Sequence, residues 1–361
     1  FKKVNKLIAK NGKESPGSAL YRQLGTPMMV NLLNKNKAFP TEYWKSGLFE
    51  EHESINADYM QENCEVKADN CPNCFLRCTK KTRILKGRHK GLFLEGPEYE
   101  TFYAIGGLNR IDSMEEIAYL NDVCDKIGVD TMSAGNMAAF AIEAFKLGKS
   151  DFEIDYNQPD KIVELLALIV KREGIGAVLA KGIKEASHEL GLEDIAVHVK
   201  GLEPSGYDPR TLKGMALSYA TSARGACHLR GTVYNAELAG LIDKDQIEGK
   251  AEMHIDFEDR SALFDCMILC RFFRDLIQWD ELGMIIEAIM GLKMTKGELQ
   301  IIANRITQNT RKYNQQEGLD STTDTLPKRM FNEATKEGES ISEADLISMV
   351  NDYNQIRESR V

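Results

Sequence analysis

The chain has 361 residues, enough for about two domains that each bury a hydrophobic core. A peptide, a small disulfide-stapled protein and a lone recognition module are therefore excluded. The 46 Lys and Arg residues against 55 Asp and Glu residues give a net charge of -9, and the basic residues do not collect in blocks. We therefore expect neither nucleic acid nor an anionic membrane as a partner. No run approaches the roughly 20 apolar residues of a membrane span, which favours a cytoplasmic protein.

In chain order, the sequence predicts mostly helices with little β-structure. The first forty residues are polar and rich in turn formers, and the segment after Pro327 is typical of an exposed helix. Between them, apolar residues recur every three or four positions in several segments, often followed by Gly. The helices expected on this basis are 113–127, 134–147, 162–172, 177–190, 261–277 and 280–290, and short strands are expected near 83–94 and 196–200.

The polar stretch KGLEPSGYDPR, residues 200–210, contains Gly and Pro and predicts a domain boundary. We therefore predict a mainly α, multihelical protein with two helical domains, residues 1–203 and 204–361, and minor β-structure.

The cysteines are unevenly distributed. Four of them lie within residues 64–78 and four are scattered, which points to a metal centre rather than a disulfide framework in a long chain without a signal peptide. Cys71, Cys74 and Cys78 form the pattern C-x2-C-x3-C, which suits three irons of a [4Fe-4S] cluster or three corners of a zinc site. A fourth ligand must come from elsewhere, and Cys64 could close a zinc site. The spacing alone leaves iron and zinc open.

Several strings together resemble the two C-terminal helical domains of the tungsten-containing aldehyde:ferredoxin oxidoreductase family. The strings are CPNCFLRC (71–78), EGPEYET (95–101), DKIGVDTMSAGN (125–136), SYATSARGACHLRG (218–231), DCMILC (265–270), RKYNQQEG (311–318) and DTLPKR (324–329). They span nearly the whole chain.

The resemblance implies a [4Fe-4S] cluster held by four cysteines, namely Cys71, Cys74, Cys78 and Cys270. We expect the remaining cysteines to be small buried apolar residues: Cys64, Cys124, Cys227 and Cys266.

The resemblance also implies a tungsten atom held by two pterins, each recognised by one D-x-x-G-L motif. The matching positions are Asp125 with Val129 and Asp265 with Leu269, and Arg230 matches a basic residue against a pterin. A carboxylate suits the guanidine-like edge of a pterin because it accepts two N–H bonds. Ile268 stands where the second motif usually has glycine.

For catalysis, Glu100 and His228 match the glutamate and the histidine that the family places beside tungsten. They are expected to act as general acid and base groups in the oxidation of aldehydes to carboxylic acids. Glu98 is the alternative if the alignment within EGPEYET has slipped by two residues. Electrons are expected to leave through the cluster to ferredoxin.

Family members also carry an N-terminal β-rich cofactor domain, which nothing in this chain resembles. Because the chain starts at Phe1, we expect a C-terminal fragment that lacks stable tungstopterin and aldehyde oxidation on its own. Two alternatives stay open. One is the catalytic subunit of an aromatic acyl-CoA reductase of the same superfamily, and the other is a zinc or iron–sulfur interaction or electron-carrier module.

Overall fold

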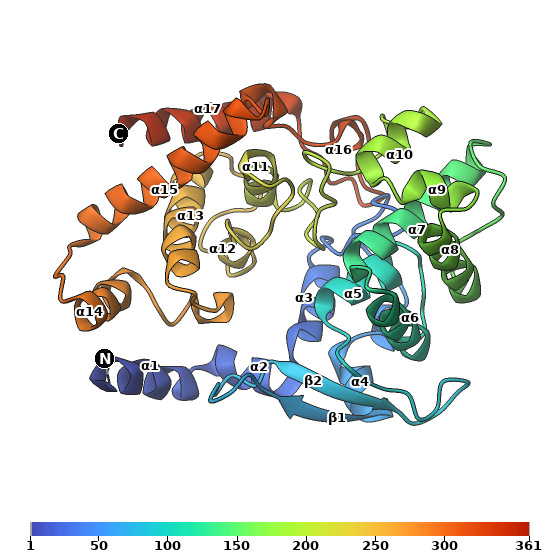
Figure 1. Ribbon diagram of the computed structural model, residues 1–361, viewed down its shortest axis with the longest axis horizontal. Helices are drawn as coiled ribbons and strands as arrows, with labels where there is room; N and C mark the ends of the chain where they lie inside the picture. The colour runs from blue at the N-terminus through green and yellow to red at the C-terminus, as the bar shows by residue number, and fades with distance from the viewer. Residues whose placement is uncertain (1, 361) are drawn as a thin grey trace. The chain divides into compact units, whose positions relative to one another are not determined.

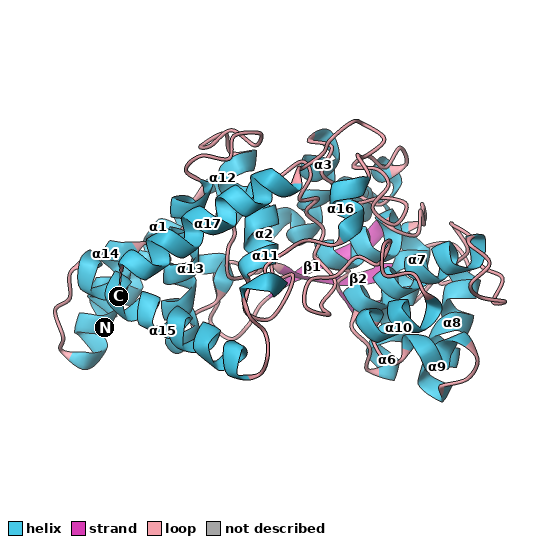
Figure 2. Cartoon of the chain, turned by 90° about the horizontal axis from the view of Figure 1, so that it is seen from above, coloured by secondary structure: helices cyan, strands magenta, loops and turns pink. Residues whose placement is uncertain are grey.

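The computed structural model describes residues 2–360, so the expectation that rested on Phe1 lies outside the described residues. The described chain consists of helices and one small three-stranded sheet (Figures 1 and 2). This confirms the predicted mainly α class with minor β-structure. None of the helices within residues 2–360 has both the length and the apolar character that crossing a membrane requires.

The chain forms two compact units, each built from separate stretches of sequence. Unit 1 comprises residues 1–19, 213–325 and 342–361, and unit 2 comprises residues 20–212 and 326–341. The sequence predicts two contiguous domains, 1–203 and 204–361. Residues 326–341 lie within the second of these segments but belong to unit 2. Arg329 of that stretch is buried in unit 2, with Glu143 at 3.7 Å and Glu333 at 2.9 Å.

Unit 1 is helical and is organised around one long helix, α13, which contacts α11, α15 and α17 (Figure 1). Its core includes Leu263 and Phe264 of α13 together with Trp279 and Leu282 of α14. The helices of this unit are α1 (Lys2–Glu14), α11 (Lys213–Thr221), α12 (Tyr234–Leu238), α13 (Lys250–Cys266), α14 (Trp279–Met290), α15 (Lys296–Gln316) and α17 (Glu343–Ser359).

Four expectations for helices are corrected by the structure. The helix expected over 177–190 is broken into two helices, Ile175–Leu179 and Ile183–Leu190. The helix expected over 261–277 ends at Cys266, and only one short turn, Arg271–Phe273, follows it. The helix near the C-terminus, α17, is not merely exposed, because it buries Met349 and Tyr353 among other side chains. The first forty residues are helical rather than turn-rich, since α1 and the two helices that follow it occupy most of them.

Unit 2 contains the sheet and the remaining helices. Its elements are α3 (Met29–Lys35), α4 (Ala57–Asn63), β1 (Cys64–Asp69), β2 (Thr79–Ile84), β3 (Phe93–Glu95), α5 (Tyr99–Thr101), α6 (Met114–Ile127), α7 (Thr131–Lys146), α8 (Pro159–Lys171), α9 (Ile175–Leu179), α10 (Ile183–Leu190) and α16 (Lys328–Asn332). The short helix α2 (Pro16–Leu24) has residues in both units. The strands pair antiparallel in the order β1-β2-β3, with Cys64 opposite Ile84 and Lys81 opposite Glu95.

The core of unit 2 depends on close packing against α7, which is buried from Ala134 to Ala144. Small residues permit this approach. A Cβ atom added at Gly135 would lie 2.3 Å from the carbonyl oxygen of Ala104, so only glycine fits there.

The stretch expected to be a domain linker is instead buried. Residues 203–212 are all shielded from solvent although they form no regular helix or strand. Arg210 has no exposed side-chain surface and pairs with Asp208 at 2.7 Å. Gly and Pro residues allow an irregular path, and here the path runs buried through unit 2 up to Leu212, the last residue before the chain enters unit 1.

The two D-x-x-G-L-like motifs form the same type of helix end. At the end of α6, Gly128 is left-handed with φ 73°, and the N–H of Val129 bonds the carbonyl of Cys124 at 3.0 Å. At the end of α13, Ile268 is left-handed with φ 56°, and the N–H of Leu269 bonds the carbonyl of Phe264 at 2.9 Å. Both are Schellman-type ends, which favour glycine at the left-handed position.

Ile268 is therefore strained, because an L-residue with a Cβ pays roughly 1–2 kcal/mol in the left-handed region. Its side chain is 93% exposed, so little burial offsets this cost. We predict that Ile268→Gly raises the free energy of unfolding by about 1 kcal/mol, because the strain is relieved. The greater backbone entropy of glycine in the unfolded chain offsets part of this gain. Denaturant unfolding at pH 7 measures this change.

The reciprocal control is Gly128→Ala, which should lower the free energy of unfolding by about 1 kcal/mol. An added Cβ at Gly128 meets no atom within 4 Å, so backbone strain alone acts there. A loss of stability in Ile268→Gly would contradict the strain at this helix end.

Candidate functional site

A cavity of about 450 Å³ in unit 2 brings three of the predicted site residues together. Glu100, Asp125 and Val129 all line it, and they come from α5, the end of α6 and the turn that follows α6. The other lining residues are Glu95, Gly96, Glu98, Thr101, Asn121, Asp130, Thr131 and Met132. The first predicted pterin motif and the predicted catalytic carboxyl group therefore share one cavity.

Glu100 is held by the buried stretch that follows Glu203. Its Oε2 accepts a hydrogen bond from the backbone N–H of Gly206 at 3.0 Å. The hydroxyl of Tyr99 donates to the carbonyl of Gly206, and the hydroxyl of Tyr103 donates to the carbonyl of Pro204. A Cβ at Gly206 would lie 2.6 Å from the Tyr103 ring, so this contact requires glycine.

Burial raises the pKa of Glu100 to about 8, with the negative charge of Asp130 adding to the rise and the Gly206 N–H opposing it. Near neutral pH the carboxyl group is therefore mostly protonated and lies close to its point of half-ionisation. A group with such a pKa is suited to give and take protons at pH 7.

Asp125 lies at the last turn of α6 and has one oxygen available. Its Oδ2 accepts from the Asn121 amide at 2.9 Å, and no hydrogen bond reaches Oδ1 within residues 2–360. The Thr101 hydroxyl lies 3.2 Å from Asn121 Oδ1 and 2.9 Å from the Thr131 hydroxyl. This series of hydrogen-bonded side chains links α5, α6 and α7. Oδ1 of Asp125, which accepts no hydrogen bond, fits the N–H edge of a pterin.

Glu98, the alternative to Glu100 as the catalytic carboxyl group, lines the same cavity. It accepts a hydrogen bond from the Thr26 hydroxyl, whose oxygen in turn accepts from the Tyr99 N–H at 2.9 Å. Burial raises the pKa of Glu98, while Thr26 and the ammonium of Lys80 oppose the rise. Because Glu98 is tied to these two groups, Glu100 remains the better candidate for proton exchange with a ligand.

Cys71, Cys74 and Cys78 lie in the loop between β1 and β2. Cys71 is exposed, while Cys74 and Cys78 are half-buried, and the Cys74 N–H bonds the Cys71 carbonyl at 3.0 Å. Three thiols in one short loop are a suitable donor set for a cluster or zinc. In the described part of the chain, however, no three His, Cys, Asp or Glu side chains are gathered to hold a metal ion.

Lys80 is a residue near this loop that the sequence did not single out. It is buried, and its ammonium donates to the carbonyls of Tyr21 at 2.9 Å and of Arg77 and Cys78 at 3.1 Å. Burial lowers its pKa, although Glu98 and Cys78 oppose this. Lys80 thus anchors the end of the cysteine loop beside the cavity. No motif marked it, because its partners are backbone carbonyls.

The remaining predicted residues belong to unit 1. His228 is half-buried, and loss of hydration, with the charges of Arg274 and Arg224, lowers the pKa of its imidazole to about 3. At neutral pH the imidazole is therefore uncharged. It lies on a loop after α11.

The second pterin motif is divided between two cavities. Asp265 and Arg230 line one of about 200 Å³, whereas Leu269 and Cys270 line an apolar one of about 330 Å³. Asp265 is already paired, with Arg271 at 2.6 Å and Arg230 at 3.6 Å. Unlike Asp125, it has no oxygen without a charged partner, so the fit to a pterin N–H edge is poorer. Arg271 was not foreseen from the sequence.

The cysteines outside the cluster pattern are mostly as expected. Cys64, Cys124 and Cys227 are buried, and burial raises the thiol pKa of Cys64 to about 11 and of Cys124 to about 12. Cys266 is exposed, so the expectation that it is buried was wrong. It is the last residue of α13.

The predicted catalytic pair and the predicted four-cysteine set each draw on both units. Glu100 and the three loop cysteines belong to unit 2, while His228 and Cys270 belong to unit 1. Their joint roles therefore stay predictions.

Comparisons with known proteins agree with the motifs. A family model described as aldehyde ferredoxin oxidoreductase, domains 2 and 3, matches residues 3–359. The tungsten-containing aldehyde ferredoxin oxidoreductases of Pyrococcus furiosus and Thermococcus kodakarensis are each 31% identical over 348 residues, covering 93% of this chain and 56% of the relative. The WOR-like subunit of an aliphatic sulfonate oxidoreductase from Pyrococcus furiosus is 28% identical, covering 63% of this chain and 38% of that protein.

Among solved structures, the fold is similar to a chain of the active-site complex BamBC of benzoyl coenzyme A reductase, bound to 1,5-dienoyl-CoA. The TM-score is 0.75 at 15% identity, with 99% of this chain and 62% of that chain covered. At this identity the likeness shows a shared fold alone.

The chain thus spans a little over half the length of the curated relatives it matches most fully. Since the family model covers residues 3–359, the protein belongs to the aldehyde ferredoxin oxidoreductase family, as its motifs predicted.

Proposed function

We propose that this chain is the portion of a tungstopterin oxidoreductase that oxidises aldehydes to carboxylic acids and passes the electrons through a [4Fe-4S] cluster to ferredoxin. The observation that carries the proposal is the cavity of unit 2, where Glu100, with a pKa raised to about 8, lies with Asp125 and Val129. A proton-exchanging carboxyl group and a free carboxylate acceptor in one cavity suit an enzyme that binds a pterin beside its reacting group.

The reaction is RCHO + H2O → RCOO⁻ + 3H⁺ + 2e⁻. The bound tungsten centre would supply the two-electron acceptor. The chain's own residues would handle the protons. Glu100 can exchange a proton near pH 7, whereas His228 is uncharged there and would contribute through a neutral ring nitrogen that hydrogen-bonds the substrate rather than as a base. Because burial sets both pKa values, water exclusion around these groups is part of their function.

The pterin contacts are proposed to involve one motif in each unit. Asp125 would accept N–H bonds through its free oxygen, with Val129 at the same helix end. Arg230 would donate to a carbonyl or phosphate acceptor, and Leu269 follows the second helix end. Asp265 would contribute mainly through its ion pairs with Arg230 and Arg271.

The whole activity is proposed to need the part of the relatives that this chain does not match. The relatives are longer by nearly half of their length, and the matched family model covers domains 2 and 3. We therefore infer that this polypeptide alone lacks aldehyde oxidation, and that an N-terminal cofactor domain supplies the remaining contacts in the cytoplasm.

The aromatic acyl-CoA reductase alternative has weaker support. Its fold is shared at 15% identity, whereas the aldehyde oxidoreductases are 31% identical over 93% of the chain. The same cysteines would hold a cluster in either enzyme, but a zinc module would not bind iron. Metal identity therefore separates the two enzyme proposals from the zinc form of the module.

We predict that Cys270→Ser abolishes formation of a [4Fe-4S] cluster, whereas Cys266→Ser leaves it intact. Both thiols are exposed and lie four residues apart, so the pair is a matched control. Reconstitution of the purified chain with iron and sulfide under argon, followed by dithionite reduction and electron paramagnetic resonance, measures the cluster. The iron content per chain should fall from about four to near zero in Cys270→Ser, because the cluster needs four thiolates.

Equal iron and signal in the two variants would exclude Cys270 as the fourth ligand. Tight binding of zinc with no cluster signal in the wild-type chain would favour the zinc module and overturn the proposed function.

We predict that Glu100→Gln changes the dependence of stability on pH. A folded-state pKa raised from 4.5 to about 8 means that the folded protein holds a proton that the unfolded chain releases. Wild-type stability from this group is therefore present below pH 4.5 and is lost as the pH rises toward 8. Relative to wild type, Glu100→Gln should gain at least about 1 kcal/mol between pH 5 and pH 8.5, since one pKa unit is worth about 1.4 kcal/mol.

Urea unfolding of both proteins at the two pH values measures the difference. Glu193→Gln is the control, because a backbone hydrogen bond and His188 lower the pKa of that exposed carboxyl, so no gain is expected at high pH. A constant difference between Glu100→Gln and wild type over this range would show that Glu100 is not protonated at pH 7.

A further inference from the structure

Helix α1 carries positive charges on one side, and the proposed function leaves them unused. Its five lysines against one glutamate give it a net charge of +4, in a chain whose net charge is -9. All five are exposed, and with roughly 3.6 residues per turn they fall within about 100° of the helix circumference. We call these residues, Lys2, Lys3, Lys6, Lys10 and Lys13, the lysine face.

The opposite side of α1 is packed into unit 1. Ile8 is 7% exposed and belongs to the same core cluster as Leu263 and Phe264 of α13. Val4 and Ile8 also line the apolar cavity of about 330 Å³ that Cys270 lines. Helix α1 contacts α14 and lies beside it in Figure 1. The lysine face is therefore one helix diameter, about 10 Å, from the cavity beside Cys270.

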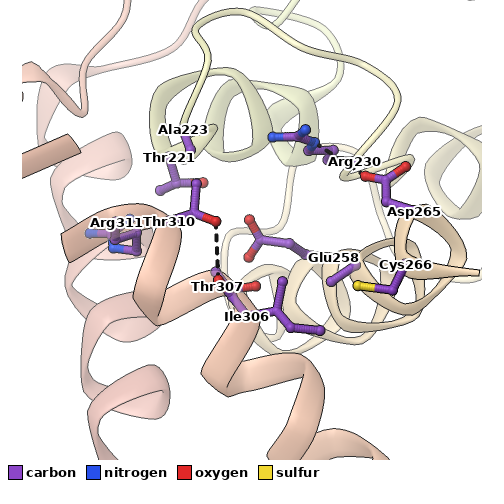
Figure 3. Close-up of a pocket in the computed structure, with 11 residues that line it drawn as sticks. Thr221, Ala223, Arg230, Glu258, Asp265, Cys266, Ile306, Thr307, Thr310 and Arg311 are labelled. Atoms are coloured by element: carbon purple, nitrogen blue, oxygen red, sulfur yellow. Dashed lines mark hydrogen bonds and ion pairs between the residues drawn. The ribbon is translucent and has the colours of Figure 1, made fainter. Parts of the chain in front are cut away.

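The lysine face is not neutralised by the described part of the chain. No ion pair reaches its five ammonium groups within residues 2–360, whereas Lys126 of α6 and Lys161 of α8 pair with acids at 2.6 and 2.9 Å. The face is also separate from the cavity of Figure 3, whose lining includes Arg230 and Asp265 and no residue of α1. Like charges three or four residues apart on a helix repel one another, and a partner with negative charge would offset this repulsion.

The composition of α1 restricts the kind of negative partner. A helix that lies in a membrane surface needs a free apolar side, and the core of unit 1 already covers that side of α1. Nucleic-acid sites favour arginine and aromatic rings, and α1 contains neither. The net negative charge of the whole chain also repels long polyanions. An acidic patch on another protein fits best.

The lysine face is also unsuited to a permanent interface. Lysine is depleted at protein interfaces, because burial removes a strongly hydrated ammonium group from water. Complexes of electron carriers are different, since they are small, often below about 1,200 Å², and are steered by complementary charge. The position of the lysine face beside Cys270 suits a carrier of this kind.

We propose that the lysine face of α1 is the docking surface for a small acidic electron-carrier protein of the ferredoxin type. In the complex, one electron passes from the reduced [4Fe-4S] cluster at Cys270 to the iron–sulfur centre of the carrier, so the first is oxidised and the second is reduced. This electron transfer rests on the proposed function. The docking itself needs only the lysine face.

The first test measures binding of the purified chain to an oxidised bacterial ferredoxin with two [4Fe-4S] clusters, by isothermal titration calorimetry. The triple variant Lys3→Glu, Lys6→Glu, Lys10→Glu should lower the affinity by about tenfold or more, because attraction becomes repulsion. Glu and Lys have similar helix propensities, so α1 should still form. Arginine at the same three positions keeps the charge and should keep the wild-type affinity.

The matched control reverses three exposed lysines on other elements, Lys90→Glu, Lys149→Glu and Lys171→Glu. It changes the net charge by the same amount, so it separates the location of the charge from its quantity. Its affinity should fall by less than about threefold. Raising the salt from about 0.05 M to about 0.3 M should weaken the wild-type complex more than that of the first variant, since salt screens exposed charges.

A second readout locates the docking surface. Bound ferredoxin should slow acetylation of Lys6 and Lys10 by about fivefold or more, measured by peptide mass spectrometry. Lys149, exposed in unit 2, serves as the unprotected control. Neither readout needs a cluster in this chain, so failure of cluster formation at Cys270 leaves both valid.

The competing partners are tested with parvalbumin, an acidic protein that carries no electrons, and with duplex DNA and phosphatidylserine vesicles. Weaker ferredoxin binding in the α1 triple variant alone, together with protection of Lys6 and Lys10, supports the proposal. No ferredoxin binding, equal weakening in the two triple variants, no protection of these lysines, or binding of any competitor as tightly as ferredoxin would overturn it. A chain that forms its cluster but does not bind ferredoxin contradicts this docking surface and leaves the proposed cluster intact.

Discussion

The burial of residues 203–212 is the constraint on which unit 2 depends. An irregular segment in the interior has no helix or sheet to pair its N–H and C=O groups, so side chains and scattered backbone contacts must do so. Tyr99 and Tyr103 satisfy two of its carbonyls, and the Gly206 N–H is satisfied by Glu100. The carboxyl group proposed for catalysis is therefore also a structural partner of this segment. Its raised pKa follows from the same burial.

In unit 1, buried polar groups are paired by charged side chains. Arg357 of α17 is buried and donates to Glu258 and Asp259 of α13, each at 2.5 Å, and to Asn304 of α15 at 3.0 Å. An unpaired buried guanidinium costs several kcal/mol, so the three helices must meet at this point. This network explains why the C-terminal helix is packed into unit 1 rather than exposed. It also fixes the orientation of the Glu258 carboxylate.

The helices that could be predicted from the sequence are those with local end signals. Gly128, Gly191 and Gly291 occupy left-handed caps at the ends of α6, α10 and α14, as their positions after apolar repeats indicated. The end of α13 was missed because the left-handed residue there is Ile268, which has low intrinsic preference for that conformation. The apolar periodicity continued past it, so the expected helix ran on to 277.

The site could be predicted only where a local motif places its residues. Both D-x-x-G-L-like motifs lie at helix ends, and the backbone bonds of the two ends match. The motif did not give the chemistry of the carboxylates, because Asp125 is bonded by an amide whereas Asp265 is paired with guanidinium groups. Contacts across long sequence separations decide that difference, and no local pattern encodes them.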